Sequence, residues 1–306
     1  MKALLPTGRA EEPVGFGEVD QPRPAAGEAV VKVEAFSVNR GEMLQLDGVL
    51  AGGERPGKDI AGLVVQAAAD GTGPQVGQRV VGHPPAGGWA EYVAVPTDAL
   101  AVLPQVVSTV TAAALPLAGL AALRLLRAAG CVSGHRVLIT GASGGVGHYF
   151  TELAVGAGTK VTAVTATPER GRRLAELGAE VIHHLDDACG PYHVVLESIG
   201  GPSTAQALSL LRPRGRMIWF GQASGEPACL NFFDFFAGPR SATVQHFHYL
   251  DADEPFGTDL DALVRLVAEG RLHPEIGRTE DWGGTAEVLA DLRDRRIRGN
   301  AVLTLG

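Results

Sequence analysis

Three glycines between residues 137 and 150 could form a backbone turn that holds a phosphate. Gly144, Gly145 and Gly147 follow an apolar run and open a helix-like stretch. Because glycine lacks a Cβ, the backbone there can turn tightly and approach a pyrophosphate, and the free N–H groups of a helix start favour negative charge. The pattern is A-x-G-x-x-G from Ala142, so a strand-to-helix connection without a ligand is the alternative. The segment predicts a dinucleotide phosphate site.

The end of the next expected strand, residues 160–166, bears on the choice between NADH and NADPH. An Asp or Glu at that end would bind the ribose 2′-hydroxyl of NADH. This strand instead leads into the small residues Thr165, Ala166 and Thr167. Three arginines follow, at Arg170, Arg172 and Arg173. Hydroxyls and a guanidinium favour a 2′-phosphate, so the sequence predicts NADPH; the alternative is that these arginines are only the solvated face of the next helix.

The elements that would position these residues alternate between strand and helix from about residue 111 to 250. Apolar runs such as 136–140 and 193–197 are separated by helix-like stretches of about ten residues. This alternation is typical of βαβ units, and the continuous apolar strands indicate a parallel sheet covered on both faces. Residues 1 to about 110 predict short strands and turns, without a helical period. We therefore expect an α/β fold with a β-rich part, to which the last strand, 300–306, returns.

Composition and charge argue against several classes of partner. The chain of 306 residues has a net charge of −8 and no basic stripe, so nucleic acid is not expected as the main partner. Its most apolar stretch, 110–123, contains a proline and is too short to span a bilayer, so no membrane association is expected. The three cysteines, Cys131, Cys189 and Cys229, form neither a disulfide framework nor a metal motif. We expect a cytoplasmic protein.

Several motifs succeed one another in a recognisable order along the chain. They are "GGWAEYVAVP" (87–96), the glycine turn, "LGAEVI" (177–182), "GRMIWFG" (215–221) and "GNAVLTLG" (299–306). Their order and spacing resemble the medium-chain dehydrogenase/reductase superfamily, in particular its zinc-free quinone oxidoreductase branch. The resemblance covers essentially the whole chain. It implies a GroES-like β-rich catalytic domain over 1–113 and 251–306, a Rossmann doubly wound NADP-binding domain over 114–250, and cofactor and substrate in the cleft between them.

The resemblance also implies site residues. Asn39 matches an asparagine that lies near the nicotinamide ribose in an N-x-x-D segment, and Glu42 replaces the acid of that segment; these two are the catalytic candidates. Leu50 stands where some enoyl reductases have a proton-donating tyrosine, and Ala121 where the family has a threonine. The expected cofactor contacts are Asn39, Gly144, Gly145, Val146, Gly147, Thr165, Ala166, Thr167, Arg170, His184, Phe220, Gly221, Gln222 and Asn300.

Zinc-dependent relatives bind their metal through an early Cys, a Gly-His-Glu motif and a later Cys or acid. Here Ser37 stands at the first position and Lys58 at the histidine, and no cysteine occurs before residue 131. A lysine ammonium is a poor metal ligand, and one histidine cannot form a site, so His83 is expected to be structural. We predict no catalytic or structural zinc.

The reaction follows from the absence of these ligands. Without a Lewis acid, reduction of a quinone or a conjugated C=C bond needs less assistance than alcohol oxidation. The sequence therefore predicts an NADPH-dependent reductase of quinones or α,β-unsaturated carbonyls. One alternative is an enoyl reductase acting on acyl-thioester or polyketide intermediates. An alternative of another class is a sensor or scaffold that binds NADPH without turnover.

Two segments bear on assembly. The β-like run 241–250 follows the last sheet strand and is a candidate sheet edge; relatives commonly pair through such edges, so a homodimer is expected. The aromatic patch "NFFDFF" at 231–236 predicts core packing, or alternatively an apolar wall of the substrate cleft or a dimer contact.

Overall fold

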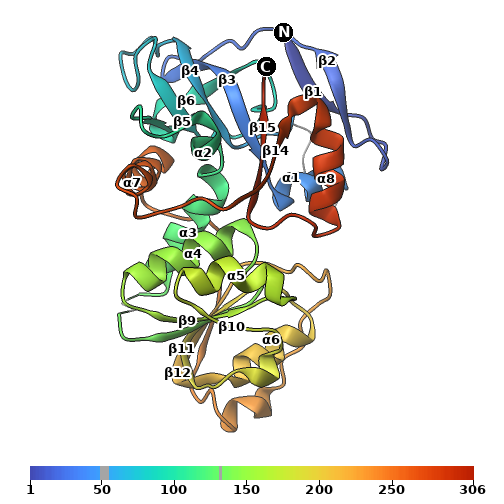
Figure 1. The fold of residues 1–306 in the computed structure, drawn as a ribbon, viewed down its shortest axis with the longest axis vertical. Helices are drawn as coiled ribbons and strands as arrows, with labels where there is room; N and C mark the ends of the chain where they lie inside the picture. Colours follow the sequence, from blue (N-terminus) through green and yellow to red (C-terminus); the bar gives the residue numbers. More distant parts are fainter. Residues whose placement is uncertain (49–54, 131–132) are drawn as a thin grey trace. The chain divides into compact units, whose positions relative to one another are not determined.

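The computed structural model describes residues 1–48, 55–130 and 133–306, so Leu50 and Cys131 lie outside the described residues. The chain divides into two compact units (Figure 1). Unit 1 comprises Met1–Leu120 and Asp253–Gly306, and unit 2 comprises Ala121–Ala252. No helix of the described segments is long and apolar enough to cross a membrane.

Unit 1 is built on an extended sheet of strongly apolar strands. The sheet runs in the order β14 (Ile276–Asp281), β15 (Asn300–Thr304), β3 (Glu28–Val38), β4 (Ile60–Gln66), β5 (Arg79–Gly82) and β7 (Leu100–Val102), and β6 (Tyr92–Pro96) also pairs with β3. A separate hairpin joins β1 (Lys2–Pro6) to β2 (Val14–Glu18). The C-terminal β15 pairs antiparallel with β3, so the expected return of the last strand is confirmed (Figure 1).

The core of unit 1 fixes the residues that surround the candidate site. Phe36 on β3 stacks on Trp89, with ring centroids 5.5 Å apart, and both are fully buried. The Trp89 indole N–H donates to the backbone carbonyl of Ser37 at 3.2 Å. A buried aromatic pair with a satisfied polar atom is a rigid support. The end of β3 is therefore held in place by the core.

The helices of unit 1 correct a sequence prediction. They are α1 (Arg40–Leu46), α2 (Thr109–Ala113), α7 (Phe256–Ala268) and α8 (Thr285–Arg293), with short 3₁₀ helices at η1 (Thr97–Ala99) and η4 (Trp282–Gly284), and α3 (Pro116–Ala128) begins in unit 1 and ends in unit 2. The prediction of no helix before residue 108 is wrong, because α1 is only seven residues long and too short to show a period. The apolar stretch 110–123 lies in two helices, α2 and α3, because Pro116 cannot continue a helix and starts a new one.

Unit 2 is a doubly wound parallel sheet, which confirms the predicted fold class. The strands run in the order β10 (Glu180–Ile182), β9 (Lys160–Val164), β8 (Arg136–Ile139), β11 (Tyr192–Glu197), β12 (Leu211–Trp219) and β13 (Thr243–His246), and every pairing is parallel. The helices are α4 (Gly145–Gly156), α5 (Pro168–Glu176) and α6 (Pro202–Ser209), with 3₁₀ helices η2 (Leu185–Asp187) and η3 (Phe232–Phe236). The first two helices pack on each other and on β9 and β10, whereas α6 packs on β11 and β12 (Figure 1).

The strand β13 ends the sheet of unit 2, as the run 241–250 predicted. The structure corrects the prediction for the aromatic patch at 231–236. Phe232, Phe233 and Phe236 are 70, 73 and 63 % exposed, so the core-packing interpretation is wrong for these three rings, and only Phe235 packs partly against the core. The three exposed rings pack on one another, with centroids 5.5 to 6.4 Å apart.

Candidate functional site

The glycine turn joins β8 to α4 in the geometry that a phosphate site requires. Gly144 is the N-cap residue of α4 and offers no side-chain cap, so the first N–H groups of the helix have no side-chain acceptor there. Among the described residues, the only heavy atom within 4 Å of the position of a Cβ on Gly144 is the Gly141 carbonyl oxygen, at 3.7 Å. A Cβ on Gly147 would collide with the backbone of Ala142, so glycine is required there. The turn is open on one side and closely packed on the other, as an anion site needs.

Arg170 lies beside this turn. Thr167 caps α5 and its hydroxyl accepts from the Arg170 backbone N–H at 3.4 Å. The Arg170 side chain reaches back, and its Nε donates to Ser143 Oγ at 3.0 Å. The buried Thr165 hydroxyl donates to the Thr167 carbonyl at 3.2 Å, which supports the same segment. The structure therefore places a guanidinium next to the glycine turn, at the end of β9.

The neighbouring arginines lie differently. Arg172 is exposed, and Arg173 forms an ion pair with Glu176 at 3.2 Å. Ala166 and His184 are exposed near the ends of β9 and β10. Of the three arginines, Arg170 contacts the turn through Ser143.

The carboxyl ends of two neighbouring parallel strands, β8 and β11, are joined by one carboxylate that sequence analysis missed. Glu197, at the end of β11, is completely buried. Its Oε1 accepts from the N–H groups of Ile199 and Gly200, both at 2.8 Å, and its Oε2 accepts from Thr140 Oγ1 at 2.9 Å and Ser203 Oγ at 3.3 Å. Four donors satisfy a carboxylate. An acid that ends the apolar run 193–197 was the signal for it.

The predicted residues 220–222 are held at the same edge of the sheet. Phe220 donates its N–H to the Glu197 carbonyl at 2.9 Å. A Cβ on Gly221 would lie 3.2 Å from Ser198 Cβ, so the two loops pack closely. Gln222 is exposed. Because ligands bind outside the carboxyl ends of parallel strands, this edge is where a dinucleotide would extend.

A second cluster lies in unit 1 and is centred on Asp59, another residue that sequence analysis did not single out. Asp59 is fully buried before β4. Its Oδ2 accepts from Ser37 Oγ at 2.6 Å and from Asn39 Nδ2 at 2.7 Å. Its Oδ1 accepts from the Leu117 N–H at 3.0 Å and lies 3.1 Å from His83 Nδ1. All four acceptor positions of the carboxylate are occupied.

Glu42 connects this cluster to the loop before β4. Its Oε2 accepts from the Asn39 N–H at 2.8 Å, and its Oε1 accepts from the Lys58 N–H at 3.0 Å. Burial, followed by the charge of Asp59, raises the pKa of Glu42 to about 8, although the two backbone hydrogen bonds act to lower it. The Glu42 carboxyl is therefore protonated at neutral pH and fixes the backbone of Asn39. The spacing N-x-x-E at 39–42 forms a capping box at the start of α1, a sequence signal that the analysis missed.

These side chains do not form a zinc site. The donors that meet at Asp59 are a hydroxyl, an amide, a backbone N–H and an imidazole Nδ1, and they use every lone pair of the carboxylate. Lys58 presents an ammonium, which has no lone pair for a metal. Within the described ranges, no group of three or more His, Cys, Asp or Glu side chains could hold a metal ion. His83 is buried, contacts Asp59 and packs edge-on against Phe256, which is the structural role predicted for it.

The remaining predicted contact, Asn300, lies in unit 1 at the start of β15. Its side-chain amide donates to the Glu275 carbonyl at 3.0 Å. Like Asn39, it belongs to unit 1, whereas the glycine turn, Arg170 and residues 220–222 belong to unit 2.

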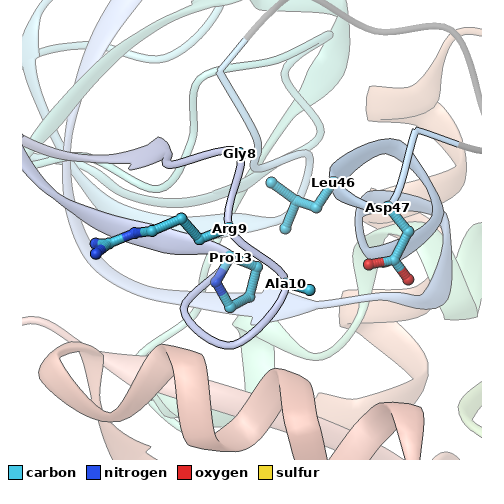
Figure 2. A pocket seen from close by; sticks show the side chains of 6 residues that line it. All are labelled: Gly8, Arg9, Ala10, Pro13, Leu46 and Asp47. Carbon is cyan, nitrogen blue, oxygen red and sulfur yellow. The ribbon is translucent and has the colours of Figure 1, made fainter.

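A pocket of about 220 Å³ lies elsewhere in unit 1, between the β1–β2 turn and the end of α1. Figure 2 shows that the Arg9 side chain extends away from Leu46 and Asp47. Arg9 pairs with Glu12, and Asp47 pairs with Arg293 at 2.6 Å, so both charges of the pocket are already neutralised. None of the predicted site residues lines it.

Comparisons with known proteins agree with this architecture. The family model of the alcohol dehydrogenase GroES-like domain matches residues 25–105, and that of the zinc-binding dehydrogenases matches residues 145–268. Together they cover more than half of the chain. The chain belongs to the medium-chain dehydrogenase/reductase superfamily. The predicted superfamily and the GroES-like and Rossmann character of the fold are thereby confirmed, and solved structures of quinone oxidoreductases support the predicted branch.

Relatives within the superfamily share the whole length of the chain. A quinone oxidoreductase from Pseudomonas syringae pv. Tomato DC3000 is 26 % identical, with a TM-score of 0.88 and 99 % of both chains covered. The Escherichia coli quinone oxidoreductase complexed with NADPH is 21 % identical, with a TM-score of 0.88 and 99 % of both chains covered. The spectinabilin polyketide synthase system protein NorB of Streptomyces orinoci is 32 % identical over 99 % of this chain, which spans 15 % of NorB.

Proposed function

We propose that the protein is an NADPH-dependent oxidoreductase that reduces quinones or α,β-unsaturated carbonyl compounds without zinc. The observation that carries this proposal is Asp59, whose four acceptor positions are all used at the place where zinc-dependent relatives bind their metal. An acceptor whose own conjugation spreads the developing negative charge needs no Lewis acid.

The residues of unit 2 fit the cofactor. The uncapped N-terminus of α4 and the open side of Gly144 suit the pyrophosphate. The Arg170 guanidinium beside the turn suits the 2′-phosphate, and no acid ends β9 to repel it. The Escherichia coli relative binds NADPH, which supports the same choice. When bound, NADPH supplies the hydride.

The residues of unit 1 orient the reacting groups in this proposal. Asn39 is the residue expected near the nicotinamide ribose, and Asp59 fixes its amide while Glu42 fixes its backbone. Glu42 accepts hydrogen bonds from two backbone N–H groups, so its role is to position Asn39. Rigid support of this kind keeps a reacting pair in productive geometry.

A second candidate function is reduction of α,β-unsaturated acyl thioesters. It is favoured by the 32 % identity to NorB, a protein of a polyketide synthase system. The reacting group, a C=C bond conjugated to a carbonyl, is chemically the same in both candidates. The two candidates differ in the group attached to the substrate at a distance from the reacting carbons.

We also propose that the protein is a homodimer that pairs through β13. All four residues of this edge strand are exposed, and Val244 on it is 38 % exposed. An exposed edge with unpaired backbone groups is a template for pairing with a second copy.

An assay of NADPH oxidation tests the proposed function. The purified chain would be offered neutral quinones, enones and crotonyl thioesters, with NADPH and NADH in parallel and with a zinc chelator present throughout. We expect turnover with NADPH on at least one conjugated acceptor and none on saturated alcohols with NADP⁺. Loss of all activity on chelation, with recovery on adding zinc, would contradict the proposal; tight NADPH binding without turnover of any acceptor would favour a sensor or scaffold.

A further inference from the structure

Arg55 has a buried polar atom without a partner. Its Nη1 is shielded from solvent and forms no hydrogen bond with any residue that the structure describes, and the side chain as a whole is half-buried. An unsatisfied buried donor costs about 1–3 kcal/mol and in native proteins usually marks a strained, catalytic or ligand-binding position. The guanidinium lies along the 87–88 segment, with Nη2 3.2 Å from the position of a Cβ on Gly87.

Lys58 is a second cation without a partner on the same loop. The sequence contains four lysines, and the other three, Lys2, Lys32 and Lys160, are exposed, whereas Lys58 is half-buried. Across the part of the chain that the structure describes, neither the Lys58 ammonium nor the Arg55 guanidinium forms a hydrogen bond or an ion pair with a carboxylate.

The loop that carries both cations is rigidly held. The Arg55 carbonyl accepts from the Gly87 N–H at 2.9 Å, and the Gly57 carbonyl accepts from the Gly88 N–H at 2.9 Å. Gly57 has a φ of 111° and no room for a Cβ against Trp89 and Gly88, so only glycine allows this close approach. Glu42 links this loop to Asn39, because its carboxyl accepts hydrogen bonds from the backbone N–H groups of both Lys58 and Asn39.

The two acids nearest along these contacts do not neutralise the cations. Glu42 is protonated at neutral pH, because burial raises its pKa to about 8. The carboxylate oxygens of Asp59 already contact four donors of their own. Two cations close in sequence, half-withdrawn from water and without an acidic partner, are unusual in a chain of net charge −8.

We propose that Arg55 and Lys58 form a subsite that binds an anionic group, a phosphate or a carboxylate, carried by the substrate. The proposal rests on the proposed function and selects among its substrates. A guanidinium binds two oxygens of such a group in one plane, and an ammonium adds a point charge. The subsite lies outside the cofactor phosphate site, which belongs to unit 2.

Matched substrate pairs test it. Crotonyl coenzyme A and the crotonyl thioester of N-acetylcysteamine share the reacting group and differ in the phosphates, and 4-oxo-2-pentenoate differs from its methyl ester only in the carboxylate. We expect kcat/KM to favour the anionic member of at least one pair by about tenfold or more, the size of one charge-assisted hydrogen bond. The pair that responds identifies the anion as phosphate or carboxylate.

Variants assign the preference to the loop. Arg55→Met and Lys58→Met should each reduce the preference for the anionic substrate about tenfold and leave kcat/KM for the neutral substrate unchanged. Arg55→Lys and Lys58→Arg should retain part of the preference. The control Lys32→Met removes an exposed lysine of β3 and should change nothing. Calorimetric binding of coenzyme A, with saturating NADP⁺ filling the cofactor site, supplies a readout without turnover and should weaken in the same variants.

The outcomes separate the two proposals. Wild-type reduction of neutral quinones with no preference in either substrate pair would overturn the subsite and leave the proposed function standing. A preference that survives in both methionine variants would also overturn it. If no acceptor is reduced, the proposed function fails, and coenzyme A binding that depends on Arg55 and Lys58 would still support the subsite.

Discussion

Replacement of Arg170 by alanine tests the assignment of the 2′-phosphate most locally. The guanidinium is already oriented in the structure, because its Nε donates to Ser143 Oγ at 3.0 Å beside the glycine turn. One charge-assisted contact to a phosphate contributes roughly 1.5–3 kcal/mol, which corresponds to about 10- to 150-fold in affinity. The Kd of NADPH measured by calorimetry should rise by that factor in Arg170→Ala, and the Kd of NADH should hardly change.

Two further variants make this test specific. Arg172→Ala removes a neighbouring arginine that is exposed, and it should leave both affinities unchanged. Ser143→Ala removes only the hydroxyl that orients the guanidinium, a hydrogen bond of about 0.5–1.5 kcal/mol, so the Kd of NADPH should rise by about 2- to 12-fold. Equal affinity of the wild type for both cofactors would refute the reasoning. An effect of Arg172→Ala as large as that of Arg170→Ala would show that a diffuse charge, and not this contact, selects the cofactor.

Three other predictions concern pH, packing and assembly. Burial raises the pKa of Glu42 to about 8, so this carboxyl loses its proton at lower pH in the unfolded state than in the folded state. The free energy of unfolding, measured by urea denaturation, should therefore fall between about pH 5 and 8 more in the wild type than in Glu42→Gln. The same pH dependence in both proteins would contradict this. Gly147→Ala should lower the melting temperature and weaken NADPH binding, because its Cβ meets the backbone of Ala142; an unchanged melting temperature would show that the turn can adapt. Val244→Lys places a charge on the edge strand β13 and should convert the dimer to a monomer in a sedimentation experiment. A wild type that sediments only as a monomer at micromolar concentration would refute the pairing.

Local signals were enough to predict the parallel-sheet fold of unit 2. The turn at Gly144–Gly147 follows a buried strand and begins a helix, and both features depend on residues that are neighbours in the sequence. The alternation of apolar strands with short helices likewise reports a parallel sheet without knowledge of distant contacts. The edge position of β13 followed from its place after the last sheet strand.

The buried acids could not be predicted in the same way. Asp59 is satisfied by Ser37, Asn39, His83 and Leu117, which come from segments up to 80 residues apart in the sequence and meet only in the folded unit. A sequence shows an aspartate beside a lysine and gives no sign that every lone pair is occupied.

Short elements and exposed aromatics were the other source of error. The helix α1 has seven residues, which is less than the length at which an apolar period becomes visible, and its capping pair was the better signal. Phe232, Phe233 and Phe236 have the composition of a core segment, yet the 3₁₀ helix that carries them lies on the surface. Whether a hydrophobic residue is covered depends on which neighbours the fold supplies, and the residue type alone does not encode this.

The central claim is reduction of a conjugated acceptor by NADPH without zinc, and transfer of an isotopic label tests it most directly. The enzyme, stripped of metal by chelation, would be given NADPH deuterated at the transferring position of the nicotinamide and an acceptor found active in the panel assay, an enone or a crotonyl thioester. The account predicts a product that carries one deuterium at the β-carbon, formed at the same rate with and without the chelator. A product without the label at that carbon, or a rate that falls to background until zinc is restored, would contradict it.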